Sequence, residues 1–257
     1  MCRTKLSRLE KGKVGQRGPP LWIALVCYIM LSVLMTWPLT MHLSSQVPTT
    51  NSDVFNVYWG NWWVRQALAQ GQNPYITEYL IYPEGFDLIS FAFSPFLALL
   101  WIPLSWILEP LAAYNLVVLA TIVLCCVATD QLVRYLTGNA WAAMVAAITF
   151  AFAPSLVAER LPHLNMSAVF WIPWAMLLLT RLMREARTRD AILLALVVVF
   201  AFLTRLQGGG LGILFGGIYF VGLVLAEGTK GSRLAPRKLA LAALGCLLLR
   251  SPLGVDG

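Results

Sequence analysis

The chain has 257 residues, of which 59% are hydrophobic and only 12% are charged, and its formal net charge is +7. Ordinary soluble domains carry roughly a quarter charged residues, so this composition excludes them and indicates an integral membrane protein. Most of the positive excess lies in short blocks between apolar runs, which is typical of cytoplasmic loops, so nucleic acid is not an expected partner. The five cysteines lie in the basic N-terminus or within apolar runs, without a CxxC motif, and predict neither a disulfide framework nor a metal site.

Residues 1–20 form a basic N-terminus with six basic side chains and one glutamate, and the apolar run 21–38 follows. A signal peptide has a similar outline, but no small-residue cleavage site follows the run. We therefore expect an uncleaved first transmembrane helix over residues 21–38, with the N-terminus in the cytoplasm. In the next segment, residues 40–88 carry four acids against Arg65 alone, which suits the outer side of the membrane.

Further apolar segments, some near the length of a membrane span, recur along the rest of the chain. They cover residues 91–108, 111–129, 140–157, 166–180, 191–204 and 211–226, and an incomplete one covers residues 239–249. The basic clusters at residues 181–189 and 230–238 are expected inside. An odd number of crossings must then separate the outer loop from residue 181, yet four segments lie between them.

Three prolines identify the segment that does not cross. Pro95, Pro103 and Pro110 each remove a backbone donor and kink a helix, so residues 91–108 are expected to lie in the outer interface, with two tryptophans at headgroup level. Residues 130–139 then fall inside, where Asp130 and Arg134 are spaced to pair on one helix. The polar turn near residue 160 falls outside, in the same compartment as residues 40–88.

These segments predict an all-α fold: a polytopic transmembrane helical bundle with a long outer loop that carries juxtamembrane helices. The outer loop covers residues 39–110, the bundle covers residues 111–249 with about five full spans and an incomplete one, and residues 250–257 form a tail. Because the last apolar run stops short of a span, we expect an N-terminal portion of a larger protein or a prematurely ended reading frame. The glycine-rich stretch at residues 207–220 is expected to give close helix packing and a flexible outer turn.

The stretch NSDVFNVYWGNWWVRQ, residues 51–66, places Asp53 at the start of a predicted helix over residues 53–69. An acid in the first turn can simply favour the helix dipole, with Asn51 or Ser52 as the cap. An acid held above the outer leaflet in an aromatic setting can also act as a general base. Four aromatic residues recur at helical spacing and predict a face turned to the interface, away from Asp53: Phe55, Tyr58, Trp59 and Trp62.

A second polar group lies at the predicted outer mouth, between residues 157 and 166: Glu159, Arg160, His163 and Asn165. These residues can simply anchor a helix end; alternatively, Arg160 and His163 contact a phosphate, with His163 as a donor or an acid and base near neutral pH. Leaving aside the C-terminal tail, the arginines expected outside are Arg65, Arg160 and Arg205, and a phosphate ester fits a guanidinium fork. Snorkelling to headgroups is the other interpretation of each arginine.

The order of these features resembles the GT-C superfamily of membrane glycosyltransferases, in particular the bacterial relatives of protein O-mannosyltransferases and aminoarabinose transferases. The resemblance covers roughly residues 20–210 and rests on TWPLTMHL, NSDVFNVYWGNWWVRQALAQGQNPY, SPFLALLWIPL and LVAERLPHLNM. It implies that Asp53 is the catalytic base, that residues 91–108 form a juxtamembrane helix and that Arg160 is the arginine of the second outer loop. His163 and Asn165 stand where the family carries an acid, and this departure puts a metal-binding role in doubt.

The implied activity is an inverting transfer of a sugar from a polyprenyl-phosphate donor to an acceptor hydroxyl or lipid, on the outer side of the cytoplasmic membrane, in the bacterial cell envelope. Asp53 would deprotonate the acceptor, and the donor phosphate would be bound by the basic residues, namely Arg160, His163, Arg205 and Arg65. The resemblance implies no cofactor beyond the lipid-linked sugar, and no residue pattern supports a divalent metal.

Two other functions stay open. One is a non-catalytic polytopic protein that binds lipid or a partner, in which Asp53 only starts a helix. The other is a transporter or flippase. This function is disfavoured because no ionisable residue lies at mid-depth of a predicted span.

Overall fold

The computed structural model describes residues 18–90 and 93–227, and this part of the chain is mostly helical, with 73% helix and almost no strand. Three of its helical segments are long and apolar enough to cross a membrane: Pro110–Thr137, Leu164–Glu185 and Leu206–Leu225. The other apolar helices, Leu21–Met35, Pro95–Leu104 and Ala140–Ala151, are shorter. The predicted helical character is therefore confirmed for the described residues, and the three long apolar helices are consistent with the predicted membrane protein. The predictions for residues 230–238, 239–249 and 250–257 lie outside them.

The chain begins with helix α1 (Leu21–Met35) and the 3-10 turn η1 (Leu39–Met41). Residues 39–110 contain helix α2 (Asp53–Ala69), strands β1 (Ile76–Thr77) and β2 (Phe86–Asp87), the turn η2 (Leu88–Ser90) and helix α3 (Pro95–Leu104). The strands pair antiparallel, with Ile76 opposite Asp87. The remaining helices are α4 (Pro110–Thr137), α5 (Ala140–Ala151), α6 (Pro154–Arg160), α7 (Leu164–Ser167), α8 (Trp171–Glu185), α9 (Thr188–Thr204) and α10 (Leu206–Glu227).

Helix α2 has the bounds that the sequence predicts. Asn51 supplies the cap, because its Oδ1 accepts the backbone N–H of Asp53 at 3.0 Å. Ser52, the other candidate, makes no side-chain capping hydrogen bond to the described residues. The helix ends at Ala69, before the turn at residues 70–73.

The aromatic residues of α2 do not form one exposed face, so that prediction is wrong. Tyr58 packs edge-on against Trp101 of α3 and Tyr114 of α4, with ring centroids 6.2 and 5.7 Å away. Trp59 and Trp62 are half-buried, and of the four predicted residues only Phe55 is exposed. The reason is tertiary: rings of α3 and α4 contact Tyr58, and Tyr79 of the loop after α2 contacts Trp62.

Helix α3 has 10 residues, and at the usual rise this gives a length of about 15 Å, too short to cross a bilayer. This agrees with the prediction that residues 91–108 do not cross. Trp101, however, is not at a surface: it is 1% exposed, and its indole N–H donates to the Pro110 carbonyl at 2.9 Å. Trp106 is exposed. Helix α3 is apolar on all sides, and contacts with α2 and α4 bury the side that carries Leu97, Ala98 and Trp101, while Leu99 on another side is exposed.

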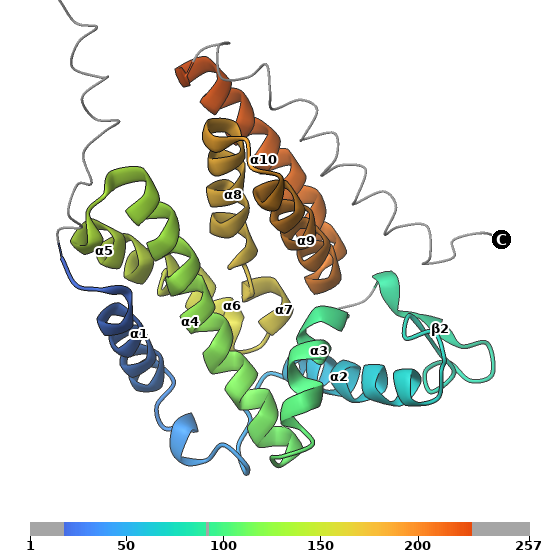
Figure 1. Cartoon of the computed structure of the whole chain (residues 1–257). Helices are drawn as coiled ribbons and strands as arrows, with labels where there is room; N and C mark the ends of the chain where they lie inside the picture. Colours follow the sequence, from blue (N-terminus) through green and yellow to red (C-terminus); the bar gives the residue numbers. More distant parts are fainter. Residues whose placement is uncertain (1–17, 91–92, 228–257) are drawn as a thin grey trace, which may run out of the picture.

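Helix α4 continues eight residues beyond the predicted end of its span at residue 129 and reaches Thr137. Gly138 then adopts a left-handed conformation, with φ of 69°, and its N–H donates to the Arg134 carbonyl at 2.9 Å. Asn139 caps α5, because its Oδ1 accepts the N–H groups of Trp141 and Ala142. These two caps turn α4 back on α5 as a hairpin (Figure 1).

The predicted span over residues 140–157 is two helices rather than one. Helix α5 ends at Ala151, three residues before Pro154, because proline has no N–H to continue the helical ladder. Helix α6 starts at Pro154, where the missing N–H has no cost, and ends at Arg160. The chain therefore returns along α4 through a broken path, α5 and then α6.

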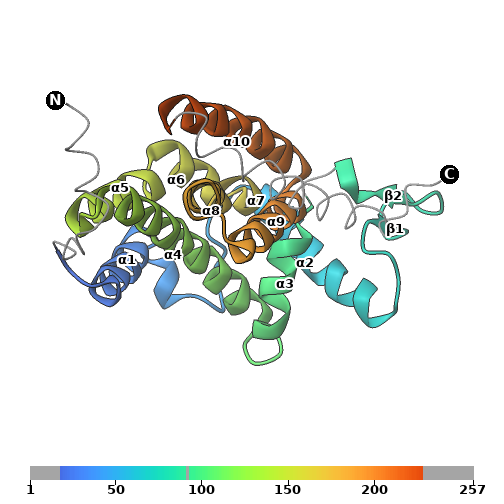
Figure 2. The same cartoon turned by 45° about the horizontal axis from the view of Figure 1, so that its top comes forward.

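Helices α8, α9 and α10 lie side by side and form a second group beside α1, α4 and α5 (Figures 1 and 2). They cover the predicted spans 166–180, 191–204 and 211–226 with shifted ends. Because α10 begins at Leu206, the expected flexible glycine turn is wrong. The expected close packing is confirmed: a Cβ at Gly212 would lie 2.4 Å from the Trp171 ring of α8, and one at Gly209 would lie 2.5 Å from Phe202 of α9.

The loops separate to two ends of the molecule. The α4–α5 and α8–α9 turns lie at one end, at the top of Figure 1, with Arg134 and the arginines of residues 181–189. The elements α2 and α3, the small sheet and the α9–α10 turn lie toward the other end. This is the separation that the charge pattern predicts, while the assignment of the first end to the cytoplasm remains a prediction.

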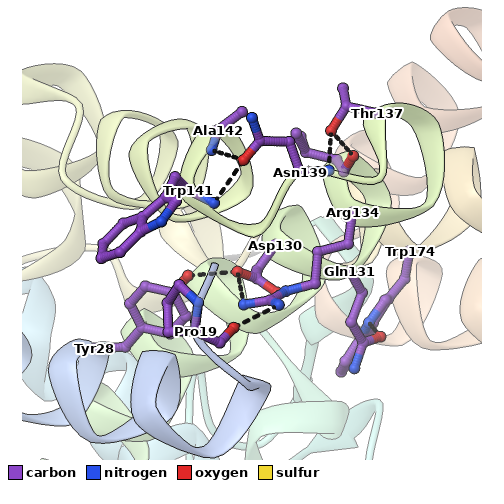
Figure 3. Close-up of polar contacts among 11 residues, drawn as sticks. Pro19, Tyr28, Asp130, Gln131, Arg134, Thr137, Asn139, Trp141, Ala142 and Trp174 are labelled. Atoms are coloured by element: carbon purple, nitrogen blue, oxygen red, sulfur yellow. Dashed lines mark hydrogen bonds and ion pairs between the residues drawn. The ribbon is translucent and has the colours of Figure 1, made fainter. Parts of the chain in front are cut away.

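The predicted pair of Asp130 and Arg134 is confirmed and belongs to a larger buried cluster (Figure 3). Asp130 is fully buried, and its Oδ1 accepts the Tyr28 hydroxyl of α1 at 2.7 Å. Arg134 contacts both oxygens of Asp130 and donates from Nη1 to the Pro19 carbonyl at 2.9 Å. Because α4 is longer than predicted, this carboxylate lies within a membrane-length helix, where it ties α4 to the start of α1.

Candidate functional site

Asp53 and His163, predicted separately, lie in contact. The Nε2 atom of His163 is 2.9 Å from Oδ2 of Asp53, and 110 positions of sequence separate the two residues. Asp53 opens α2, and His163 immediately precedes α7, which packs on α2. The structure therefore brings the acid of the first predicted outer loop together with the polar turn of the second. The sequence predicts that both lie on the same side of the membrane, and their contact requires this.

The carboxylate of Asp53 is held from two sides. When the ring proton is on Nε2, His163 donates to Oδ2, and the Asn56 side chain donates from Nδ2 to Oδ1 at 3.3 Å. The side chain of Asp53 is 44% exposed and that of His163 is 23% exposed. Each carboxylate oxygen can accept more than one hydrogen bond. The oriented, half-exposed Asp53 therefore retains acceptor capacity toward a ligand.

Asn165 lies two residues after His163 and is buried at 3% exposure. Neither its side-chain oxygen nor its nitrogen finds a hydrogen-bond partner among the described residues. Leaving a buried amide without partners costs about 1–3 kcal/mol per group. Because Asn165 follows His163 by two positions, its amide is a candidate polar contact for a ligand of this site.

Arg65 lies away from this pair, although the sequence suggested a phosphate role for it. It is twelve positions after Asp53 on α2, which places it about 18 Å along the helix axis. Its Cζ lies 5.2 Å from the centroid of the Trp101 ring, and its Nη1 donates to Ser105 Oγ at 3.3 Å. The contacts of Arg65 therefore join α2 to α3.

Arg205 follows α9 at the α9–α10 turn, where its Nη2 donates to Gln207 Oε1 at 2.8 Å. Glu159 and Arg160 are the last two residues of α6, and the backbone reaches His163 three positions later. Of the predicted set, the structure thus places Asp53 and His163 in contact, with Asn165 in the adjoining helix α7.

Sequence reasoning missed Asn56 as a partner of Asp53. A signal was present in the sequence, because residues three positions apart on a helix share one face. Within residues 18–90 and 93–227, no group of three or more His, Cys, Asp and Glu side chains is placed to hold a metal ion.

Comparison with known proteins found no matching family model, no similar curated protein and no similar solved structure.

Proposed function

We propose that this chain is a membrane glycosyltransferase that moves a sugar from a polyprenyl-phosphate donor to an acceptor hydroxyl or lipid on the outer side of the membrane. In this proposal the helices form a polytopic bundle in the cytoplasmic membrane, with the N-terminus inside and residues 39–110 outside. The observation that carries the proposal is the contact between Asp53 and His163. Two further observations support it: the sequence layout resembles that of GT-C enzymes, and the buried amide of Asn165, two positions after His163, has no partner among the described residues.

The proposed reaction is one displacement at the anomeric carbon. Asp53 takes the proton of the acceptor hydroxyl, and the acceptor oxygen forms a bond to the anomeric carbon from the side opposite the phosphate. The bond between that carbon and the phosphate oxygen breaks, and polyprenyl phosphate leaves with the electron pair. The sugar configuration is inverted, and a general base of this kind contributes about 10²–10⁴-fold to the rate.

His163 takes a different role from the one that the sequence suggested. Because its Nε2 contacts Asp53, we assign it as a positioning residue that holds the carboxylate toward the acceptor, rather than as a direct phosphate ligand. The charge on the leaving phosphate is then assigned to Arg160, the last residue of α6 and three positions before His163 in the chain, with the Asn165 amide as a further polar contact.

The test of the base is Asp53→Asn in the full chain, assayed in membranes for transfer from radiolabelled polyprenyl-phosphate sugars. The amide keeps the size of the side chain, and its oxygen still accepts from His163, but it does not accept the acceptor proton. We expect transfer to fall by about 10²-fold or more. The matched control is Asp87→Asn, which makes the same charge change in the same segment, on a residue whose Oδ1 only caps a local turn at Ile89. Equal transfer by wild type and Asp53→Asn would remove Asp53 from the mechanism.

The test of the positioning role compares His163→Gln with His163→Leu. The amide of glutamine can still donate to Asp53, whereas leucine cannot, so we expect transfer to be largely retained in the first and reduced about tenfold or more in the second. Rescue by glutamine but not by leucine distinguishes a positioning role, which needs a hydrogen-bond donor, from a role in packing alone. Equal loss in the two variants would contradict this role.

A further inference from the structure

Three consecutive apolar side chains are exposed in the turn between α3 and α4, at the bottom of Figure 1. Trp106 is 75% exposed, Ile107 is 84% exposed, and Leu108 is exposed as well. The turn is fixed, because the backbone N–H groups of Ile107 and Leu108 both donate to the Leu104 carbonyl. Helix α4, one of the membrane-length helices, begins two residues later at Pro110. Exposed apolar side chains at the start of such a helix are placed to meet lipid at the level of the headgroups.

The guanidinium of Arg65 contacts the residue that precedes these apolar side chains. Its Nη1 donates to Ser105 Oγ at 3.3 Å, and its Cζ lies 5.2 Å from the centroid of the Trp101 ring. A guanidinium carries five N–H donors. Among the described residues, Arg65 makes this one hydrogen bond and no ion pair with a carboxylate. Because the side chain is only half-buried, its remaining donors are accessible to a ligand.

A hydroxyl and a carboxylate lie near this guanidinium. Burial raises the pKa of the Tyr58 hydroxyl, the charge of Arg65 lowers it and the charge of Glu109 raises it, so both charges act on this one group. Tyr58 is half-buried, and its hydroxyl makes no hydrogen bond to the described residues. Glu109, the residue before α4, is exposed and makes no side-chain capping hydrogen bond. The surface beside the turn therefore combines a cation, a hydroxyl and an anion that are not paired with one another.

We propose that Arg65, Tyr58 and Glu109 form a binding site for a phospholipid headgroup with a phosphate and a primary ammonium group, the chemistry of phosphatidylethanolamine. The phosphate oxygens accept hydrogen bonds from the guanidinium and the tyrosine hydroxyl, and the ammonium group donates to the Glu109 carboxylate. The acyl chains lie against Trp106 and Ile107. A headgroup with both charges complements the site, whereas a headgroup that cannot donate leaves the carboxylate without a hydrogen bond. None of these residues takes part in the proposed transfer reaction, so this proposal does not depend on it.

The experiment measures the binding of phosphatidylethanolamine and phosphatidylcholine to the full chain in mixed micelles by native mass spectrometry. Both lipids are zwitterionic, so attraction by net charge is the same, but the quaternary amine of phosphatidylcholine has no N–H to donate. Wild type should bind phosphatidylethanolamine about tenfold more tightly, which is the effect of one hydrogen bond to a charged group. Equal affinities for the two lipids would overturn the proposal.

Glu109→Gln tests the contact with the amine. It removes the charge from an exposed side chain, so folding is retained, and the preference for phosphatidylethanolamine should fall about tenfold. The matched control Glu84→Gln removes an exposed acid of the turn between β1 and β2 and should change the preference by less than about twofold. Equal falls in the two variants would overturn the site.

Two further variants test the phosphate contacts. Tyr58→Phe removes only the hydroxyl, and Arg65→Lys keeps the charge but loses the planar fork, so the affinity for both lipids should fall about fivefold or more in each. The control Arg187→Gln, at an exposed side chain of the α8–α9 turn, should change it by less than about twofold. Unchanged affinity in either test variant would overturn the proposal. Phosphorylethanolamine, the headgroup without acyl chains, should not displace the lipid at millimolar concentrations, and displacement would identify a site for a soluble phosphate instead.

Discussion

Replacing Asp130 by alanine tests the buried charge cluster between α1 and α4. The carboxylate of Asp130 is 0% exposed and accepts hydrogen bonds from Tyr28 and Arg134. In the alanine variant the Arg134 side chain, itself only 9% exposed, loses its counter-charge and keeps only its hydrogen bond to Pro19. Removing one member of a buried ion pair costs about 3–5 kcal/mol, because the other charge stays buried and unpaired.

The structure also ranks the other variants of the cluster. Tyr28→Phe removes one hydrogen bond but leaves Asp130 paired with Arg134, so we expect a loss of about 1 kcal/mol in the free energy of unfolding. Asp130→Leu/Arg134→Met removes both charges and replaces them with apolar groups, which is often neutral or stabilising, so the double variant should lie within about 1–2 kcal/mol of wild type. The double variant should therefore be more stable than Asp130→Ala.

The assay is reversible unfolding in mixed micelles, with sodium dodecyl sulfate as denaturant and tryptophan fluorescence as the signal. The free energies of unfolding of wild type, Asp130→Leu, Arg134→Met and the double variant give the coupling energy between the two charges, and Asp130→Ala and Tyr28→Phe are measured beside them. The reasoning would be refuted if Asp130→Ala cost less than about 1 kcal/mol, or if the double variant were as unstable as Asp130→Ala.

Three shorter predictions concern helix packing, a loop anchor and pH. Gly212→Ala places a methyl group against the Trp171 ring and should lower the free energy of unfolding in sodium dodecyl sulfate by about 1–3 kcal/mol. Gly216→Ala meets open space within the described residues and should be neutral or slightly stabilising in the same assay. Asn115→Leu removes two hydrogen bonds, of 2.8 and 2.9 Å, to the carbonyls of residues 43 and 46, so limited proteolysis of the loop at residues 43–52 should accelerate by about tenfold or more. Burial raises the pKa of the Tyr58 hydroxyl above its ordinary value of 10.0, with Arg65 opposing this effect. The stability contributed by the neutral Tyr58 hydroxyl is therefore present below pH 10.0 and is lost as pH rises through the raised pKa. In Tyr58→Phe, the free energy of unfolding should decline less steeply above pH 10.0 than in wild type.

Local signals in the sequence account for the features that were predicted well. The bounds of α2 follow from Asn51, which can cap the helix, and from the turn residues after Ala69. The prolines around residues 95–110 explain why α3 is too short to cross, since each removes a backbone donor. The pair of Asp130 and Arg134 follows from helical spacing alone.

Helix ends and burial were predicted less well, because they depend on contacts between distant segments. Residues 130–137 are too polar to extend a hydropathy window, yet α4 continues through them until Gly138 takes the left-handed conformation. From its residue type, Trp101 was predicted to lie at the membrane interface. In the structure, α2 and α4 enclose it, and the Pro110 carbonyl accepts its indole N–H. Residue type alone does not distinguish these environments.

The candidate site was also predicted only in part. The charge pattern could place Asp53 and His163 on one side of the membrane, but their direct contact depends on how α7 packs against α2. For Arg65, the charge pattern suggested a ligand, whereas the structure uses the side chain to join α2 to α3 through Trp101. Neither packing arrangement leaves a periodic signal in the sequence.

The separation of Asp53 from His163 by 110 positions sets an order of assembly. At usual rates of synthesis, helix α2 emerges roughly 5–20 s before its partner turn. During this time the carboxylate has no imidazole partner, while α4 and α5 are synthesised and pack against each other as a hairpin. A substitution that delays that hairpin, far from either side chain, would therefore leave the newly made protein with an incomplete centre.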